Sequence, residues 1–382
     1  MLEDFLNAKP LFYDEIDYTR MPRVYKRIQK NFDLAKIIHI VGTNGKGTSG
    51  RFLATALSRL GYNTGHYTSP HILKFNERIW FNGNDVSMEL LEDTHRELLT
   101  LLTQDEIKSL SYFEYTTLLA MLFFSSKCDY IILEAGLGGE YDATAVFTNL
   151  LTVVTPIDID HESFLGSDIR AIAQTKLNAI QKTALLAKQT YKEVQEVLLE
   201  LQLQKEIKAY YFDELLDQQD YENIQSIAQD EHLPAYLQDN LALSIAVLKY
   251  LHIAYKKENF YNARLFGRLT ELKKNIIIDV GHNVLAARSI VKSLEGKKYI
   301  LVYNSYKDKN YKEILRILKP IITSVSLIDV YNNRIEESSY LQDTLDELAI
   351  QWDTFTTTNA DESYLVFGSF SVVEAFLRSE HG

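Results

Sequence analysis

The stretch that decides the fold is IHIVGTNGKGTSGRF, residues 38–52. Its first residues are β-branched, its middle places four glycines within nine residues (Gly42–Gly50), and an apolar helical pattern continues to Leu60. A glycine-rich turn from a strand into a helix points successive backbone N–H groups at one place, and the helix start adds positive partial charge. The stretch therefore predicts a phosphate-binding loop, in which Lys46 reaches the outer phosphates of a nucleotide and Thr48 lies near Mg²⁺.

The spacing within this loop is unusual. The common loop reads G-x-x-x-x-G-K-[ST], whereas this chain has Gly42-Thr43-Asn44-Gly45-Lys46-Gly47-Thr48. Two residues instead of four separate the first two glycines, and a third glycine stands between the lysine and the threonine. A tight structural turn would also use glycines, but a lysine between a strand and a helix favours phosphate binding. The loop alone does not choose among the classes of nucleotide-binding protein.

Two of those classes lack their motifs. A switch GTPase needs a D-x-x-G and an N-K-x-D sequence, and neither occurs in the chain. A dinucleotide-binding fold has one candidate, residues 136–141, but its third fingerprint position is Tyr141 instead of a small residue. Both classes are therefore disfavoured.

The composition limits the kind of protein. The chain has 382 residues, enough for two domains, and a net charge of −12, which argues against non-specific nucleic-acid binding. Its single cysteine, Cys128, permits no intramolecular disulfide, so we expect a reducing compartment and a core role for this thiol. The acidic N-terminus has no apolar signal core, and the longest apolar run, Leu118–Phe124, is too short to span a bilayer. We expect a soluble, cytoplasmic, monomeric protein whose partners are small molecules, with no nucleic acid and no membrane among them.

Strand-like and helical runs alternate along almost the whole chain, which predicts an α/β protein with mainly parallel sheets. Strands are expected at 37–41, 62–67, 130–134, 151–155, 275–279, 299–303, 325–329 and 363–367. Helices are expected at 46–60, 87–103, 112–126, 168–180, 235–252, 284–294 and 310–319. The polar residues 186–232 break the rhythm, and there we expect a peripheral strand or helix. A second α/β rhythm begins after KKENFYNAR (256–264), so we place one domain at 1–260 and the other at 261–382.

Polar groups that a core would not select follow several of the expected strands. Glu134 ends one strand, His161 comes shortly after the next, and Lys176 lies on a helical run. Ligands of an open α/β sheet bind at the carboxyl ends of its strands. A loop or capping role would be the simpler interpretation of His161 alone. Beside Glu134 and a phosphate loop, the two side chains indicate a site for a divalent cation.

Several of these stretches together resemble one family. GTNGKGT, TSPHILKFNERI, YFEYTTLLAMLFF, ILEAGLGGEYDAT and DIDHESFLG are similar to motifs of the folylpolyglutamate synthase/dihydrofolate synthase family, within the Mur-ligase superfamily. The C-terminal half adds FGR, DVGHN, KDKN and VFGSF, so the resemblance runs from about residue 12 to 375. It implies a P-loop, Mur-ligase-like ATP-binding domain with a mostly parallel sheet, and a smaller α/β C-terminal domain that binds the amino acid.

The resemblance also implies a reaction. Family members use ATP to phosphorylate a carboxylate, and an amino acid's amine attacks the resulting acyl phosphate. The implied enzyme is an ATP-dependent ligase that forms C–N bonds by adding L-glutamate to dihydropteroate or to folate (poly)glutamates and releases ADP and phosphate. One alternative is a cell-wall Mur ligase that acts on a UDP-linked peptide, but only 41 residues precede Gly42, too few for its UDP-binding domain. The other is a P-loop regulator that is no ligase.

Roles for individual residues follow from the resemblance alone. The loop holds the phosphates, Lys46 neutralises charge on the transferred phosphoryl group, and Lys176 aligns with a lysine that the family carbamylates, which would make it an anion able to hold a metal. The Mg²⁺ ligands are implied to be Ser69 and Glu134 at one site, and Glu134 and His161, with Lys176, at a second. The positions matching ATP contacts are Gly42, Thr43, Asn44, Gly45, Lys46, Gly47, Thr48, Asn240, Arg268, Asp279 and His282. The positions matching the pterin pocket are Tyr112, Phe113, Glu114, Asp142 and Ala143.

The chain departs from the family pattern at two informative places. Thr175, Leu177 and Asn178 replace the usual Glu before, and Ala-Gly-Ile after, the carbamylated lysine, so a plain solvated helix lysine remains an alternative for Lys176. Residues 236–237 are Tyr-Leu where the family usually has His-Gln, so the adenine or ribose contacts are expected to differ.

Overall fold

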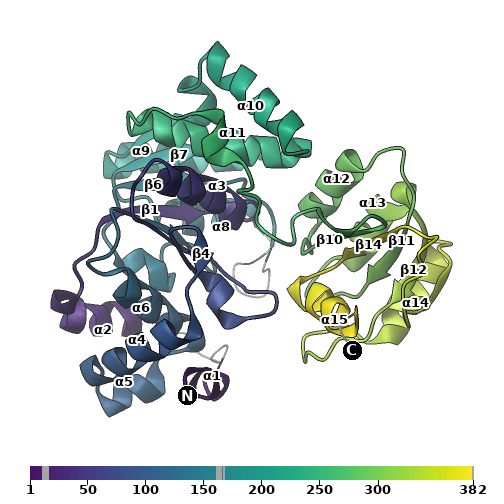
Figure 1. Cartoon of the computed structure of the whole chain (residues 1–382), viewed down its shortest axis with the longest axis horizontal. Helices are drawn as coiled ribbons and strands as arrows, with labels where there is room; N and C mark the ends of the chain where they lie inside the picture. The colour runs from purple at the N-terminus through teal and green to yellow at the C-terminus, as the bar shows by residue number, and fades with distance from the viewer. Residues whose placement is uncertain (11–16, 161–165, 167, 381–382) are drawn as a thin grey trace. The chain divides into compact units, whose positions relative to one another are not determined.

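A computed structural model describes residues 1–10, 17–160, 166 and 168–380 (Figure 1). The chain forms two compact units. Unit 1 comprises Met1–Ile159, Ser167–Leu233 and Leu237–Ala263, and unit 2 comprises Asp160–Gly166, Pro234–Tyr236 and Arg264–Gly382. Each unit contains its own mostly parallel sheet with helices packed on it, so the predicted α/β fold class is confirmed.

The sheet of unit 1 has eight strands in the order β4-β3-β2-β5-β1-β6-β7-β8. The strands are β1 Lys36–Val41, β2 Thr64–Tyr67, β3 Ile79–Phe81, β4 Asn84–Asp85, β5 Tyr130–Glu134, β6 Leu151–Val154, β7 Thr183–Leu186 and β8 Lys208–Tyr211. All neighbours pair in parallel except at the β2–β3 and β3–β4 junctions. The central strands read KIIHIV and YIILE, and near-continuous apolar runs of this kind suit strands that are buried on both faces.

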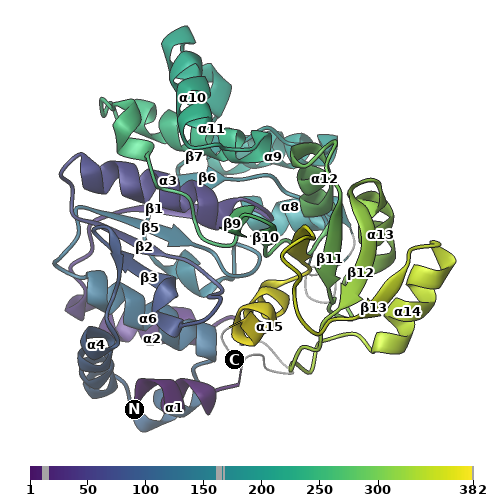
Figure 2. The ribbon, with the colours of Figure 1, turned by 45° about the vertical axis from the view of Figure 1, so that its right-hand side comes forward.

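Helices cover both faces of this sheet (Figures 1 and 2). They are α1 Leu2–Asn7, α2 Arg20–Ile28, α3 Lys46–Arg59, α4 Met88–Leu101, α5 Gln104–Ser109, α6 Tyr112–Phe124, α8 Ile169–Leu177, α9 Lys192–Lys205, α10 Gln218–Asp230 and α11 Ala235–Tyr250. Helix α6 is deeply buried: every residue from Glu114 to Phe124 is shielded from solvent. It begins with a reciprocal capping box between Ser111 and Glu114, which satisfies two backbone N–H groups at its start.

Unit 2 has a six-stranded sheet in the order β13-β12-β11-β14-β10-β9. The strands are β9 Thr270–Lys273, β10 Ile276–Asp279, β11 Tyr299–Tyr303, β12 Ile322–Leu327, β13 Trp352–Thr354 and β14 Tyr364–Phe367, and β9 alone among them runs antiparallel to its neighbour. Helices α12 Val284–Ser293, α13 Tyr311–Leu318, α14 Ser338–Glu347 and α15 Phe370–Glu380 pack on it. Its core consists of apolar strand residues such as Leu301 and Leu365 packed against helix residues such as Ile314 and Leu345.

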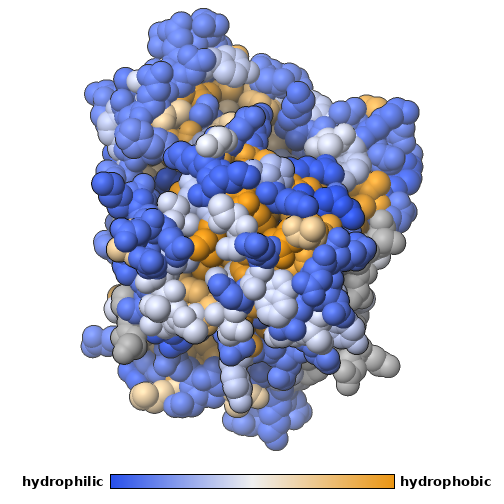
Figure 3. Space-filling view, turned by 90° about the vertical axis from the view of Figure 1, so that its right-hand side faces the viewer, coloured by the Kyte–Doolittle hydropathy of each residue, from blue (hydrophilic) through white to orange (hydrophobic). Residues whose placement is uncertain are grey.

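Two of the expected elements are corrected by the structure. The strand expected at 325–329 is β12, Ile322–Leu327, which begins three residues earlier because Ile322 and Ser324 also pair with β11, with a register shift between them. The region 186–232 holds helix, strand and helix (α9, β8, α10) instead of a single element, and β7 before it was not expected. In the part of the chain that the structure describes, no helix is both long and apolar enough to cross a membrane. Hydrophilic side chains cover most of the face seen in Figure 3, with apolar ones between them.

Candidate active site

The phosphate loop lies where β1 ends and α3 begins. Gly45 caps α3 with a positive φ of +89°, and Gly42 has a φ of +138°. A Cβ atom on Gly42 would meet Thr155 Oγ1 at 2.1 Å, and one on Gly45 would meet Asn240 Oδ1 at 2.4 Å. Both positions therefore need glycine for conformation and for space. The first N–H groups of α3 have no partner within the helix, which leaves them available for an anion.

Lys46 is the first residue of α3, and its ammonium group folds back over the loop. Its Nζ atom donates to the carbonyl oxygens of Gly42 and Thr43, both at 3.3 Å. The same Nζ lies 3.9 Å from Glu134 Oε1. The lysine predicted to meet the phosphates is thus placed beside the carboxylate predicted to bind a metal: Lys46 begins the helix that follows β1, and Glu134 ends β5.

Glu134 is a buried carboxylate at the carboxyl end of β5, with 4% of its surface exposed. It accepts hydrogen bonds from the Thr68 hydroxyl and, at 3.3 Å, from the Ser69 N–H. A buried charge needs such donors and a counter-charge, which Lys46 supplies. The structure therefore brings Ser69, Glu134 and Lys46 together. Thr68 was missed by sequence reasoning, although it precedes Ser69 in the TSPH motif.

Lys176 lies on α8 and has 4% of its surface exposed. Its Nζ atom donates to the Gly42 carbonyl oxygen at 3.0 Å. The alternative of a plain solvated helix lysine is therefore wrong, because α8 packs this side chain against the phosphate loop. Its carbamylation stays a prediction.

His161 lies outside the described residues, and its role as a metal ligand stays a prediction. Asp160, immediately before it, belongs to unit 2. The carboxylate of Asp160 forms an ion pair with the buried Lys309, accepts a hydrogen bond from Asn283 Nδ2 at 3.1 Å, and lies 3.6 Å from His282 Nε2. Among the described residues, no three His, Cys, Asp or Glu side chains converge as a metal site.

Asn240 is placed at the phosphate loop by α11. Its side-chain oxygen accepts a hydrogen bond from Ser49 Oγ at 3.1 Å, and it lies against Gly45. The Ser244 hydroxyl in turn donates to the Ser49 carbonyl oxygen at 2.9 Å. Helix α11 is therefore joined to the first turns of α3 next to the loop.

In unit 2, Asp279 ends β10 and is the centre of a hydrogen-bond cluster. It accepts from Gly281 N at 2.7 Å, Leu269 N at 2.9 Å and the Tyr236 hydroxyl at 3.1 Å. Burial raises the pKa of Asp279, and burial together with the charge of Asp279 raises the pKa of Tyr236 well above its ordinary value. The departure noted in the sequence at position 236 thus supplies a hydroxyl donor to a predicted nucleotide contact. Arg268 lies over the Phe370 ring, 5.3 Å from its centroid.

The predicted pterin-pocket residues come from the start of α6 and the loop after β5. Phe113 packs against Gly136 so closely that a Cβ there would lie 2.6 Å from the ring. Glu114 is buried in an ion pair with Arg20 at 2.9 Å, and Arg78 lies over the ring of Tyr112. Asp142 caps the short helix Ala143–Val146, and burial raises its pKa. Both predicted carboxylates therefore already have partners inside the protein.

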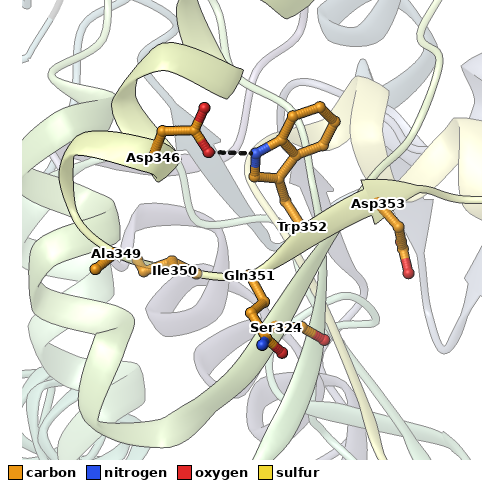
Figure 4. A pocket seen from close by; sticks show the side chains of 7 residues that line it. All are labelled: Ser324, Asp346, Ala349, Ile350, Gln351, Trp352 and Asp353. Carbon is orange, nitrogen blue, oxygen red and sulfur yellow. Dashed lines mark hydrogen bonds between the residues drawn. The ribbon is translucent and has the colours of Figure 1, made fainter.

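A hollow of about 730 Å³ in unit 2 does not coincide with any predicted site (Figure 4). Its lining residues are Ser324, Asp346, Ala349, Ile350, Gln351, Trp352 and Asp353. The Trp352 indole N–H donates to Asp346 at 2.9 Å, as the dashed line marks. Trp352 begins β13 and Gln351 precedes it, whereas ligands of parallel sheets bind at the carboxyl ends of strands.

The chain was compared with known proteins. No protein-family model matches it. It is 32% identical over 366 residues to the dihydrofolate synthase/folylpolyglutamate synthase of Buchnera aphidicola subsp. Schizaphis graminum, covering 88% of this chain and 86% of that protein. The chain belongs to the dihydrofolate synthase/folylpolyglutamate synthase family. Its structure also resembles the crystal structure of Helicobacter pylori folylpolyglutamate synthetase, with 35% identity, a TM-score of 0.80, and coverage of 100% of this chain and 98% of that one.

This family assignment confirms the predicted enzyme class, an ATP-dependent ligase. Two further structures share the fold and contain ligands. Escherichia coli FolC in complex with DHPP and ADP is 23% identical, with a TM-score of 0.84 and coverage of 99% and 96%. The Yersinia pestis bifunctional folylpolyglutamate synthase/dihydrofolate synthase, complexed with AMPPNP and Mn ion, is 24% identical, with a TM-score of 0.84 and coverage of 100% and 97%. Nucleotide, a divalent metal and a folate-type substrate are thus bound by proteins of this fold.

Proposed function

We propose that this protein adds L-glutamate to dihydropteroate and to folate (poly)glutamates. ATP phosphorylates the acceptor carboxylate, the amine of glutamate attacks the acyl phosphate, and ADP and phosphate are released. The observation that carries the proposal is the pairing of Lys46 with the buried Glu134 at a phosphate loop, in a member of a family of glutamate ligases.

The phosphate loop and Lys46 carry the phosphoryl transfer. Catalysis of this step consists mainly of positioning and of stabilising charge on the transferred group. The N–H groups at the start of α3 hold the phosphates, and the Lys46 ammonium moves from the carbonyl oxygens of Gly42 and Thr43 to the transferred phosphoryl oxygens. The backbone N–H groups of α3 are fixed donors, which need no reorganisation when the charge develops.

The oxygen donors beside the loop fit Mg²⁺. Protein sites usually hold this ion through one or two carboxylates together with substrate phosphates and water, and Glu134 with Ser69 provides such a set. We assign Ser69 and Glu134 to one Mg²⁺, and Glu134 and His161 to a second. Bound Mg²⁺ supplies positive charge that polarises the phosphoryl oxygens. Carbamylation of Lys176 would replace the ammonium beside Gly42 with an anion for the second ion.

The remaining predicted residues take substrate-binding roles in this proposal. Nucleotide contacts are assigned to Gly42, Thr43, Asn44, Gly45, Lys46, Gly47, Thr48, Asn240, Arg268, Asp279 and His282. Contacts to the pterin are assigned to Tyr112, Phe113, Glu114, Asp142 and Ala143. Residues 1–260 would bind ATP and the carboxylate acceptor, and residues 261–382 would bind glutamate.

An ADP-release assay tests the proposal. The purified protein is given ATP, Mg²⁺ and L-glutamate with either dihydropteroate or tetrahydrofolate as acceptor. A ligase releases ADP and forms an amide only when acceptor and glutamate are both present. Slow ADP release that is independent of both substrates would instead indicate a regulatory nucleotide switch, and activity only with a UDP-linked peptide would indicate a cell-wall ligase.

A further inference from the structure

His39 is a buried polar residue in the strand that leads into the phosphate loop. It lies in the middle of β1, three positions before Gly42, between Leu133 of β5 and Thr152 of β6, and 1% of its surface is exposed. Burial lowers the pKa of His39 to about 4, so its imidazole is neutral near pH 7. An apolar side chain here would avoid the desolvation cost of the ring. We therefore expect the imidazole to be kept for the hydrogen bond that it forms.

His39 begins a chain of three side chains. Its Nε2 atom lies 2.8 Å from Thr144 Oγ1, and Thr144 Oγ1 lies 2.5 Å from Asp142 Oδ1. Asp142 also accepts N–H groups on both oxygens, so the Thr144 hydroxyl donates its proton to Asp142. The Thr144 oxygen must then accept from His39, which places the imidazole proton on Nε2. The other ring nitrogen, Nδ1, is buried without a hydrogen-bond partner among the described residues.

Asp142, the last of these three side chains, holds the glycine turn (residues 136–139) that follows Glu134. Asp142 Oδ2 accepts from Leu137 N at 2.9 Å, and Asp142 N donates to Gly139 O at 3.1 Å. On its other side the turn presses on α8, since a Cβ on Gly139 would lie 2.8 Å from the Lys176 carbonyl oxygen. The turn is thus held between α8 and the three side chains.

We propose that His39 is a positioning residue for the acceptor: through Thr144, it fixes the Asp142–Ala143 segment at the place where the pterin binds. The inference rests on the proposed function, which assigns Asp142 and Ala143 to the pterin. It adds that their placement depends on a side chain of β1, whose end carries the phosphate loop. The phosphate loop and the acceptor segment are thereby anchored to the same strand.

Steady-state kinetics with dihydropteroate as the varied substrate test this role, with ATP, Mg²⁺ and glutamate saturating. His39→Leu and Thr144→Val each break the chain without adding bulk. Each should raise the KM for dihydropteroate about tenfold, which corresponds to about 1.4 kcal/mol. The kcat and the KM for ATP should stay within about threefold of the original values, because a loss of binding that is equal in the ground state and the transition state raises KM and leaves kcat unchanged. His39→Gln keeps an N–H donor at the reach of Nε2 and should restore most of the acceptor KM.

Thr152→Val is the matched control. Thr152, on β6, is as fully buried as Thr144, but its hydroxyl lies 3.5 Å from Asn149 Oδ1 and takes no part in the hydrogen bonds from His39 to Asp142. The control should lower thermal stability without changing the acceptor KM. The inference is overturned if Thr144→Val has the same acceptor KM as Thr152→Val, or if His39→Gln is no better than His39→Leu. Should His39→Leu fail to fold, the two threonine variants still decide. An original protein that releases no ADP with dihydropteroate would contradict the proposed function instead.

Discussion

Buried neutral histidines should make unit 1 sensitive to mild acid, and His39 allows the effect to be measured. Burial lowers the pKa of His39 to about 4, whereas a histidine in the unfolded chain has a pKa of about 6.5. The neutral form is therefore favoured by folding. Its contribution to stability is complete above about pH 6.5 and is lost as the pH falls from there toward about 4.

The expected loss follows from these two pKa values. At pH 5 the unfolded chain binds almost one more proton at this residue than the folded chain does, and integrating from pH 8 gives a loss of about 2 kcal/mol. His66 acts in the same direction, because burial lowers its pKa well below the ordinary value. Asp142, whose pKa burial raises, opposes the loss. The total change in the free energy of unfolding is thus the sum over several groups. A comparison of proteins that differ only at position 39 isolates the part due to His39.

The assay is urea unfolding at pH 8, 7, 6 and 5, followed by tryptophan fluorescence. The chain has two tryptophans, Trp80 in unit 1 and Trp352 in unit 2, so a Trp352→Phe background reports unit 1 alone. Between pH 8 and pH 5, this background should lose about 2 kcal/mol more stability than the same protein carrying His39→Gln. The exposed His232 provides the control, since His232→Gln should leave the pH dependence unchanged. Parallel curves for the background and His39→Gln would refute the reasoning.

Four substitutions test the site itself. Lys46→Ala should lower turnover by about 10²–10³ with unchanged circular dichroism, and near-normal turnover would refute the role of the loop. Glu134→Gln should sharply raise the Mg²⁺ concentration needed for half-maximal rate; if Glu134 only stabilises the turn, stability falls instead. Gly45→Ala should raise the KM for ATP at least about tenfold, because the added Cβ strains the loop. The thermal midpoint of unit 2, which should not change, is the control. Lys176→Ala should lose activity that acetate partly restores; full activity of the original protein in CO₂-depleted buffer, with an unmodified peptide mass, would exclude carbamylation.

Much of unit 1 could be predicted because its signals are local. The run of β-branched residues before Gly42 and the apolar spacing after it specify β1 and α3 whatever surrounds them. Glu134 could be placed at a strand end for the same reason, since its strand is apolar up to that residue. The phosphate loop and the place of Glu134 at a strand end beside it thus followed from the order of residues along the chain.

The partners of these residues depend on contacts between distant segments, and no local pattern encodes them. Thr68 is 66 positions from Glu134, and Lys176 is 134 positions from Gly42. A lysine on an amphipathic helix gives the same local pattern whether it faces solvent or another loop, which is why the burial of Lys176 could not be decided. His39 did leave a signal, a titratable residue inside the apolar run KIIHIV, but a signal of that kind does not name its partner.

The compact spacing of the phosphate loop has a structural consequence. Because only two residues separate Gly42 from Gly45, Lys46 is just four positions after Gly42 and three after Thr43, whose carbonyl oxygens it contacts. A loop this short forms few contacts within itself that could fix its conformation. Neighbouring segments hold its conformation. The N–H of Thr43 donates to the carbonyl oxygen of Pro156, just after β6, and Asn240 of α11 packs on Gly45. The ammonium of Lys176 on α8 donates to the carbonyl oxygen of Gly42. A short loop can hold a phosphate rigidly only if its neighbours are rigid. Substitutions in those three supporting elements should therefore weaken nucleotide binding even though they leave every loop residue in place.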